Sequence, residues 1–104
     1  MKQSMILHSV YFYFKTDTPE EIFEQQRERI FELNNQLSVV QLTFAGPPAG
    51  IERDVVDNSY GMSLHMLFQD EADLNTYQQH ELHQKFVADF KPYWTSIKVY
   101  DTSV

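Results

Sequence analysis

The sequence of 104 residues contains no cysteine. This absence excludes disulfides, a thiolate nucleophile and a cysteine-bound zinc site, and it suits a reducing cytoplasm, where we expect the protein. Basic residues are also few, since eight lysines and arginines stand against fifteen acidic residues, for a net charge of −7. Nucleic acids and anionic membrane surfaces attract clustered positive charge, so we expect no nucleic acid and no membrane as a partner.

Long apolar runs are missing as well. The run at residues 5–14 is interrupted by His8 and Ser9 and is too short to cross a bilayer. Because it lacks a small-residue cleavage site, the pattern favours a strand over a signal peptide. A hydrophobic share of 42% and a charged share of 22% are ordinary for a globular chain, so we expect a single domain over residues 1–104.

Periodicity predicts four strands, at residues 5–15, 38–46, 59–69 and 94–101. A helix is predicted from Thr18 to about Asn34, with Thr18 as N-cap, Pro19 at the first helical position and Glu21 closing a capping box. Its apolar stripe is formed by Ile22, Phe23, Ile30, Leu33 and Leu37. In the second strand, the apolar alternation of Val40, Leu42 and Phe44 is set against Gln41 and Thr43.

Residues 70–90 carry two helical stripes that are out of phase. On one continuous helix, His83, Phe86 and Phe90 would lie on one side. Leu74 would lie on the side opposite His83, and Tyr77 would be rotated about 120° from His83 around the helix axis. Both stripes can face one sheet only if the chain changes direction between them. We therefore predict two short helices with a break at His80, which would turn Tyr77 and His83 towards each other.

The order strand, helix, strand, strand, helix pair, strand predicts an α+β fold of the ferredoxin-like type. In this fold a four-stranded antiparallel sheet carries its helices on one face. The other face is also expected to be apolar, and a large exposed apolar sheet is unusual on a monomer. Its residues are Tyr11, Tyr13, Val39, Leu67 and Tyr100. We therefore predict a homodimer in which two sheets meet face to face and form a dimeric α+β barrel.

Several stretches of the chain resemble the stress-responsive dimeric α/β-barrel proteins, often called Dabb domains. The resemblance rests on MILHSVYFYFK, on the Tyr-Gly-Met strand that leads into LHMLFQDEADLNTYQQHELHQKF, and on SIKVYD near the end. Its most specific part is the spacing of Tyr77, His80, His83 and Phe86, together with His8. The resemblance implies a ferredoxin-like protomer that dimerises through its sheets.

A plant polyketide cyclase of this family is similar at a Tyr and a His that fall on Tyr77 and His83. The chain departs from the family pattern at Glu81, where proline is usual after the first His. It departs from the cyclase at Met62, where the cyclase has a histidine, so we expect a more apolar pocket here.

Two functions follow from these residues. In the first, the pocket binds a small apolar or carbonyl-containing ligand, lined by His8, His80, Met62 and Phe86. In the second, the protein is a lyase or cyclase in which Tyr77 and His83 are catalytic. There His83 would remove a proton next to a carbonyl and Tyr77 would donate a hydrogen bond to the resulting enolate oxygen.

Other interpretations stay open. Each histidine could be structural, and His80 could simply cap the helix that follows it. A metal site of His8, His80 and His83 is weakly indicated, because the spacing in HELHQ differs from that of the zinc-protease motif. We therefore expect no metal and no cofactor. A monooxygenase of the antibiotic-biosynthesis or haem-degrading type, which shares the dimeric barrel, is a further alternative.

Overall fold

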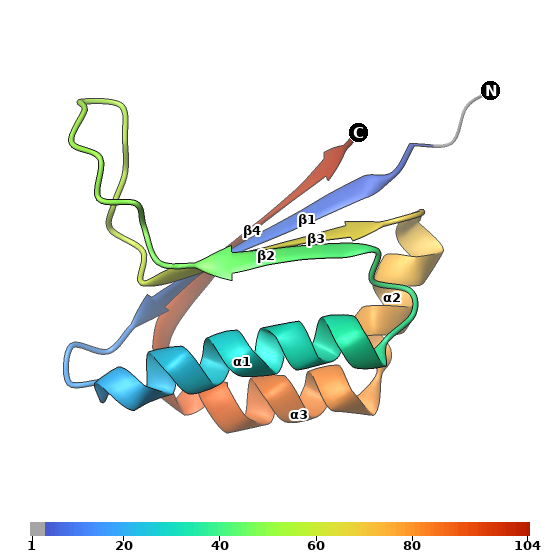
Figure 1. The fold of residues 1–104 in the computed structure, drawn as a ribbon, viewed down its shortest axis with the longest axis horizontal. Helices are drawn as coiled ribbons and strands as arrows, with labels where there is room; N and C mark the ends of the chain where they lie inside the picture. Colours follow the sequence, from blue (N-terminus) through green and yellow to red (C-terminus); the bar gives the residue numbers. More distant parts are fainter. Residues whose placement is uncertain (1–3) are drawn as a thin grey trace.

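The strands of the chain form one antiparallel sheet, and the helices cover one of its faces (Figure 1). This computed structural model describes residues 4–104. In chain order the elements are β1 (Ile6–Phe14), α1 (Glu20–Gln36), β2 (Leu42–Gly46), β3 (Met62–Phe68), α2 (Glu71–Gln79), α3 (Glu81–Phe90), the 3-10 turn η1 (Lys91–Tyr93) and β4 (Trp94–Ser103). The strand order β2-β3-β1-β4 confirms the predicted ferredoxin-like arrangement.

Strand β1 lies in the middle of the sheet and divides its side chains between the two faces. Val10 pairs with Leu64 of β3 and Val99 of β4 on the face that the helices cover. Its neighbour Tyr11 points to the opposite face, which we call the open face. Within residues 4–104, no helix is long and apolar enough to cross a membrane.

The start of α1 differs from the prediction. The helix begins at Glu20 with Pro19 in the N-cap position, and the predicted capping box of Thr18 and Glu21 does not form. The Thr18 hydroxyl instead donates to the Lys15 carbonyl at 2.7 Å, closing the turn before the helix. The fixed φ of proline fits an extended N-cap as well as the first helical position. The predicted N-cap therefore lies one residue before the observed one.

The faces of β2 are the reverse of those predicted. Thr43 and Ala45 are buried on the helix side, whereas Phe44, which is 62% exposed, and Leu42 lie on the open face. Val40 is buried because it belongs to a turn after α1, in which its amide donates to Leu37, and not because it shares a strand face. Val39 likewise packs against the core. The prediction that it lies on the open face is therefore wrong.

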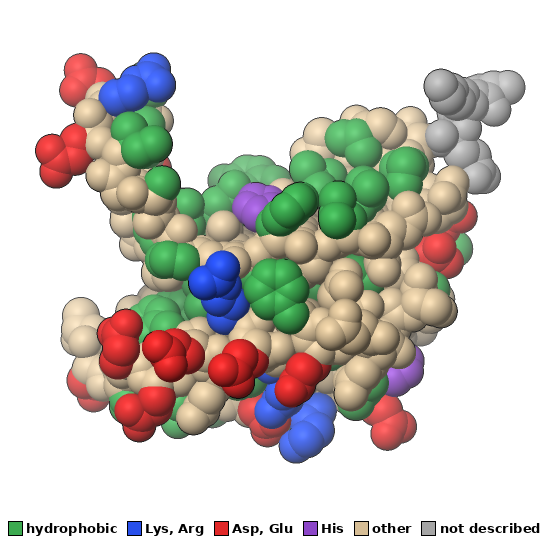
Figure 2. Space-filling model, in the orientation of Figure 1, with side chains coloured by type: hydrophobic (Ala, Val, Ile, Leu, Met, Phe, Trp, Pro, Cys, Tyr) green, Lys and Arg blue, Asp and Glu red, His purple; other side chains and the backbone are tan. Residues whose placement is uncertain are grey.

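A long excursion, residues 47–61, joins β2 to β3. We call it the arm, because Figure 1 shows it rising from the sheet on the side away from the helices. Local bonds shape it, since the Asn58 side chain donates to the Ile51 carbonyl and the Ser59 amide donates to the Asp57 carboxylate. Val55 is 81% exposed on the arm. In Figure 2 acidic side chains gather over the helical layer, and hydrophobic ones lie over the sheet.

A buried polar link between α1 and β4 fixes the helix layer on the sheet. Gln26 is fully buried; its side-chain oxygen accepts a 2.8 Å hydrogen bond from the Trp94 indole, and its nitrogen lies 3.6 Å from the Met62 sulfur. Buried polar groups are costly when they lose their partners. Gln26 was not predicted as a core residue, because its type is usually exposed.

We expect the substitution Gln26→Leu to lower the free energy of unfolding by about 1–3 kcal/mol, because it leaves the Trp94 indole without an acceptor. Urea unfolding followed by the fluorescence of the single tryptophan measures this change. Gln25→Leu, on the exposed face of the same helix, is the matched control and should change stability by less than about 0.5 kcal/mol. Equal stability of the Gln26 variant and the wild type would contradict the link.

Candidate functional site

The site is built where α2 stops and α3 begins. His80 has an extended backbone between the two helices, which confirms the predicted break. Its Nδ1 atom accepts a 3.1 Å hydrogen bond from the Leu82 amide, so the side chain caps α3 as expected for a helix N-terminus. After the break, Phe86 and Phe90 of α3 are buried, as Leu74 and Tyr77 of α2 are.

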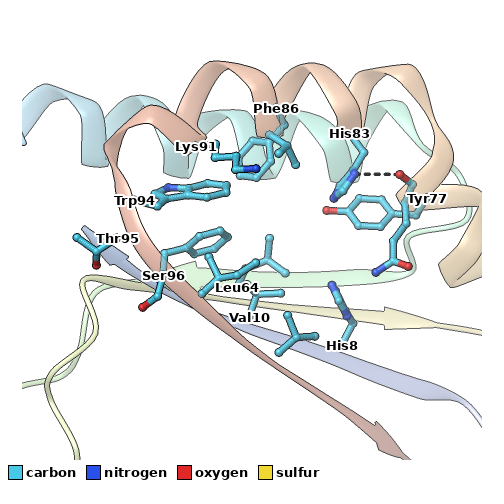
Figure 3. A pocket seen from close by; sticks show the side chains of 15 residues that line it. His8, Val10, Leu64, Tyr77, His83, Phe86, Lys91, Trp94, Thr95 and Ser96 are labelled. Carbon is cyan, nitrogen blue, oxygen red and sulfur yellow. Dashed lines mark hydrogen bonds between the residues drawn. The ribbon is translucent and has the colours of Figure 1, made fainter. Parts of the chain in front are cut away.

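A cavity of about 420 Å³ lies between this helix pair and the sheet (Figure 3). It is exposed to solvent along β4, because Ile97 and Val99 on the helix side of this strand remain 46% and 45% exposed. Its walls are mostly apolar and aromatic, with a few polar groups, which is typical of small-molecule sites. The lining residues are His8, Val10, Phe12, Leu64, Tyr77, Gln78, His83, Phe86, Val87, Lys91, Trp94, Thr95, Ser96, Ile97 and Val99.

Tyr77 and His83 meet at one end of this cavity, as the break at His80 predicted. Their ring centroids are 4.6 Å apart, in an edge-to-face arrangement. The Tyr77 side chain is only 1% exposed, and burial raises the pKa of its hydroxyl well above the usual range. Its hydroxyl points into the cavity (Figure 3), where it can act as a neutral donor.

The His83 ring is held in one orientation by the end of α2. Its Nδ1 atom lies 3.1 Å from the Gln78 carbonyl, which can only accept, so Nδ1 carries the proton and donates. The lone pair of the neutral ring is therefore on Nε2. Burial lowers the pKa of His83, the neighbouring His8 lowers it further, and the Gln78 hydrogen bond opposes both effects. His83 is thus neutral at pH 7 and suited to accept a proton.

His8 faces the same end of the cavity from the sheet. It is 4% exposed and its Nδ1 atom is 2.6 Å from a carboxylate oxygen of Asp101, directly opposite it on β4. Because the carboxylate accepts, Nδ1 carries the proton of this bond, and in the neutral form of the ring Nε2 is the acceptor. The His8 and Tyr77 ring centroids are 6.3 Å apart.

The sequence reasoning missed Asp101, whose role depends on pairing with a residue 93 positions earlier. An acidic residue near the end of a strand is usually only solvated, so its type gave no signal. The expected antiparallel pairing of the first and last strands could have identified it, provided that the register was known. The register sets His8 opposite Asp101 and Val10 opposite Val99.

The other expected ligand-binding residues divide into two groups. Phe86 lines the cavity, with its ring 6.4 Å from that of His83. Met62 lies in the core beside Gln26 and does not reach this cavity, because α1 covers that part of β3. His80 does not line it either, since its ring is used to cap α3.

The metal alternative receives no geometric support. Across residues 4–104, no three His, Asp or Glu side chains gather as a potential metal site. The three histidines that the alternative required bond to different partners: His8 to Asp101, His80 to the Leu82 amide and His83 to the Gln78 carbonyl.

The model of the stress responsive A/B barrel domain matches residues 6–104. The chain belongs to this family. The family match confirms the predicted resemblance to Dabb proteins and covers every residue described above as part of the site. No curated protein matches the chain.

Solved structures share the fold of this family member. A hydroxynitrile lyase from Passiflora edulis has a TM-score of 0.87 at 16% identity, covering 99% of this chain and 95% of its own. A dimeric ferredoxin-like protein from Thermobifida fusca has a TM-score of 0.83 at 16% identity, with coverages of 99% and 93%. A dimeric protein from Bacteroides fragilis with a ferredoxin-like fold has a TM-score of 0.80 at 21% identity, with coverages of 98% and 98%. At such identities the likeness shows the fold alone.

The lowered pKa of His83 predicts how stability depends on pH. The unfolded chain binds a proton at this residue near the usual pKa of 6.5, and the folded chain binds it only at lower pH. Between the two pKa values the unfolded state holds more protons, so the free energy of unfolding falls as pH decreases through this window and is unaffected above it.

We therefore expect His83→Gln to show a smaller loss of stability between pH 7.5 and pH 5 than the wild type, measured by urea unfolding. A decrease will remain in the variant, because burial also lowers the pKa of His65. An NMR titration of the His83 ring that gave a pKa at or above 6.5 would contradict the prediction.

Proposed function

We propose that the cavity between the helix pair and the sheet binds a small, largely apolar compound that carries a carbonyl group. The aromatic rings of Phe12, Phe86 and Trp94 provide an apolar wall for such a compound. The hydroxyl of Tyr77 supplies a hydrogen-bond donor at the inner end, where a carbonyl oxygen is the natural partner. This proposal requires no group beyond the chain itself.

A proton-transfer reaction at this site is favoured by one observation: the Tyr77 hydroxyl and the neutral His83 ring face the same end of the cavity, side by side. The Nε2 atom of His83 would take a proton from the carbon next to the carbonyl, and the electron pair of the broken C–H bond would move to the carbonyl oxygen. Tyr77 would donate a hydrogen bond to that enolate oxygen. The imidazolium would then return the proton, so the protein is regenerated.

His8 would be a third group at the reacting end, oriented by Asp101. Its Nε2 atom can accept a hydrogen bond from a hydroxyl group of the substrate, or exchange the proton that His83 removes. The hydroxynitrile lyase of the same fold shows that this scaffold is compatible with lyase chemistry, although the proposal rests on the residues of this site. We propose the reaction class only, as a lyase, cyclase or isomerase that acts next to a carbonyl.

We also propose that the protein is a homodimer that joins its sheets through the open face. Tyr11 lies in an aromatic cluster there, with ring centroids 5.0 Å from Tyr60 and 6.0 Å from Tyr100. Leu42 and Phe44 of β2 extend this apolar surface and remain 49% and 62% exposed in the described part of the protomer. The arm rises on the same side of the sheet, so it would lie beside a partner sheet stacked on this face. The structures from Thermobifida fusca and Bacteroides fragilis are described as dimeric, in support.

Proton abstraction can be tested without knowledge of the product. We expect the protein to accelerate the exchange of deuterium from water into the carbon next to the carbonyl of aryl ketones, followed by NMR. Both His83→Gln and Tyr77→Phe should lower this rate by at least about a hundredfold, because each removes a group that acts in the transition state.

The matched controls are Tyr93→Phe and His65→Gln, since neither residue lines the cavity. Both control variants should retain the wild-type exchange rate. Exchange that persisted in both site variants would rule out the catalytic assignment. Tight binding of the ketones without any exchange in the wild type would leave ligand binding as the function.

The dimer is tested by light scattering after size exclusion at micromolar concentration, where we expect twice the mass of the chain. The substitution Tyr100→Asp should shift the protein towards monomer, because it places a carboxylate within the aromatic cluster of the open face. Gln25→Asp, on the exposed side of α1, should leave the mass unchanged. A monomer mass for the wild type would contradict the proposal.

A further inference from the structure

The charge of the cavity contrasts with that of the chain. The protein has a net charge of −7, yet no Asp or Glu side chain lines the cavity. Among residues 4–104, the only lining residue with a permanent charge is Lys91, which is positive. Asp101 bonds to His8 but is not itself among the lining residues. From the described lining residues, a ligand inside the cavity therefore meets one permanent cation, and the nearby Asp101 carboxylate lies behind His8.

Lys91 is fixed where the helix layer turns into the last strand. It follows the last residue of α3 and opens η1, and its amide donates to the Val87 carbonyl. Pro92 restricts the backbone that follows. Among residues 4–104, the Lys91 ammonium group forms no ion pair, whereas that of Lys85 in the preceding helix α3 lies 3.4 Å from the Asp89 carboxylate. The Lys91 charge is thus not compensated by a protein carboxylate.

Lys91 and the reacting groups lie at opposite ends of the cavity. Figure 3 shows Lys91 beside Trp94 and Phe86 at one end, and Tyr77, His83 and His8 at the other. The aromatic rings next to Lys91 are closely packed, with the Trp94 centroid 4.7 Å from that of Phe12 and 6.0 Å from that of Phe86, and Val10 and Leu64 line the cavity as well. A ligand that spans the cavity would therefore have a carbonyl end, an apolar or aromatic middle and an end that meets a cation.

We propose that the natural ligand is an organic acid, an aromatic or similarly apolar keto acid, whose carboxylate lies against Lys91 while its carbonyl lies against Tyr77. Lys91 is then a specificity-determining residue that selects anionic over neutral carbonyl compounds. This inference rests on the proposed function, because it assumes that the cavity is the ligand site. Lys91 is exposed to solvent, so the selection is modest and decreases with salt.

The test compares acids with their neutral analogues. Calorimetric titration would measure the binding of a panel of aryl keto acids, such as 4-oxo-4-phenylbutanoate, and of the matching methyl esters. In the wild type we expect the acids to bind about threefold to fivefold more tightly than the esters at low salt. Lys91→Met should abolish this preference while the esters bind as before. Lys85→Met, which removes the same charge from the exposed side of the preceding helix α3, should preserve this preference.

The outcomes separate this inference from the proposed function. If acids and esters bind equally to the wild type, or if the preference persists in Lys91→Met, the role of Lys91 is overturned and the ligand site stands. If neither acids nor esters bind at millimolar concentration, the cavity is not a site for carbonyl compounds, and both proposals fail. A preference lost equally in Lys85→Met would reflect the general charge of the protein and would also overturn the role of Lys91.

Discussion

The extended backbone of His80 is the constraint on which the site depends. A continuous helix through residues 71–90 would turn Tyr77 and His83 away from each other, because six residues correspond to about 600° of rotation. The break removes this restriction, so that both helices bury their apolar sides on the same sheet. It is stabilised locally, since the His80 amide donates to the Tyr77 carbonyl and its ring caps Leu82. With Glu81 in place of the usual proline, these bonds hold the break.

The elements could be predicted because burial imposes a period on each of them. The mismatch between the stripes of Leu74 and Phe86 was sufficient to locate a break that no single residue marks. The phase of β2 could not be predicted this way, because Val40 is buried by a turn and Phe44 faces the open side. An apolar residue shows that a position is covered or awaits a partner. The residue type alone does not distinguish these two cases. On a sheet with apolar side chains on both faces, it therefore cannot show which face the helices cover.

The part of the site that lies within one short segment could be predicted, and the part that joins distant segments could not. Tyr77 and His83 belong to one short segment, so helix geometry alone relates them. Asp101 and Lys91 depend on how distant segments meet, which requires the strand register and the end of α3. Met62 was assigned to the pocket from the resemblance to the cyclase, which has a histidine at this position, and it does lie on the helix side of β3. The α1 side chain of Gln26 covers it, however, and this buried glutamine was not expected from its type.

The alternation of side chains along β1 and β4 assigns adjacent residues to different tasks. Val10 and Val99 border the cavity, while their neighbours Tyr11 and Tyr100 form part of the open face. A partner sheet on the open face would therefore stiffen the floor of the cavity without entering it. The cavity would stay accessible along β4 on the helix side, where Ile97 is still exposed. Assembly and ligand access can thus coexist on one four-stranded sheet, because each uses its own face.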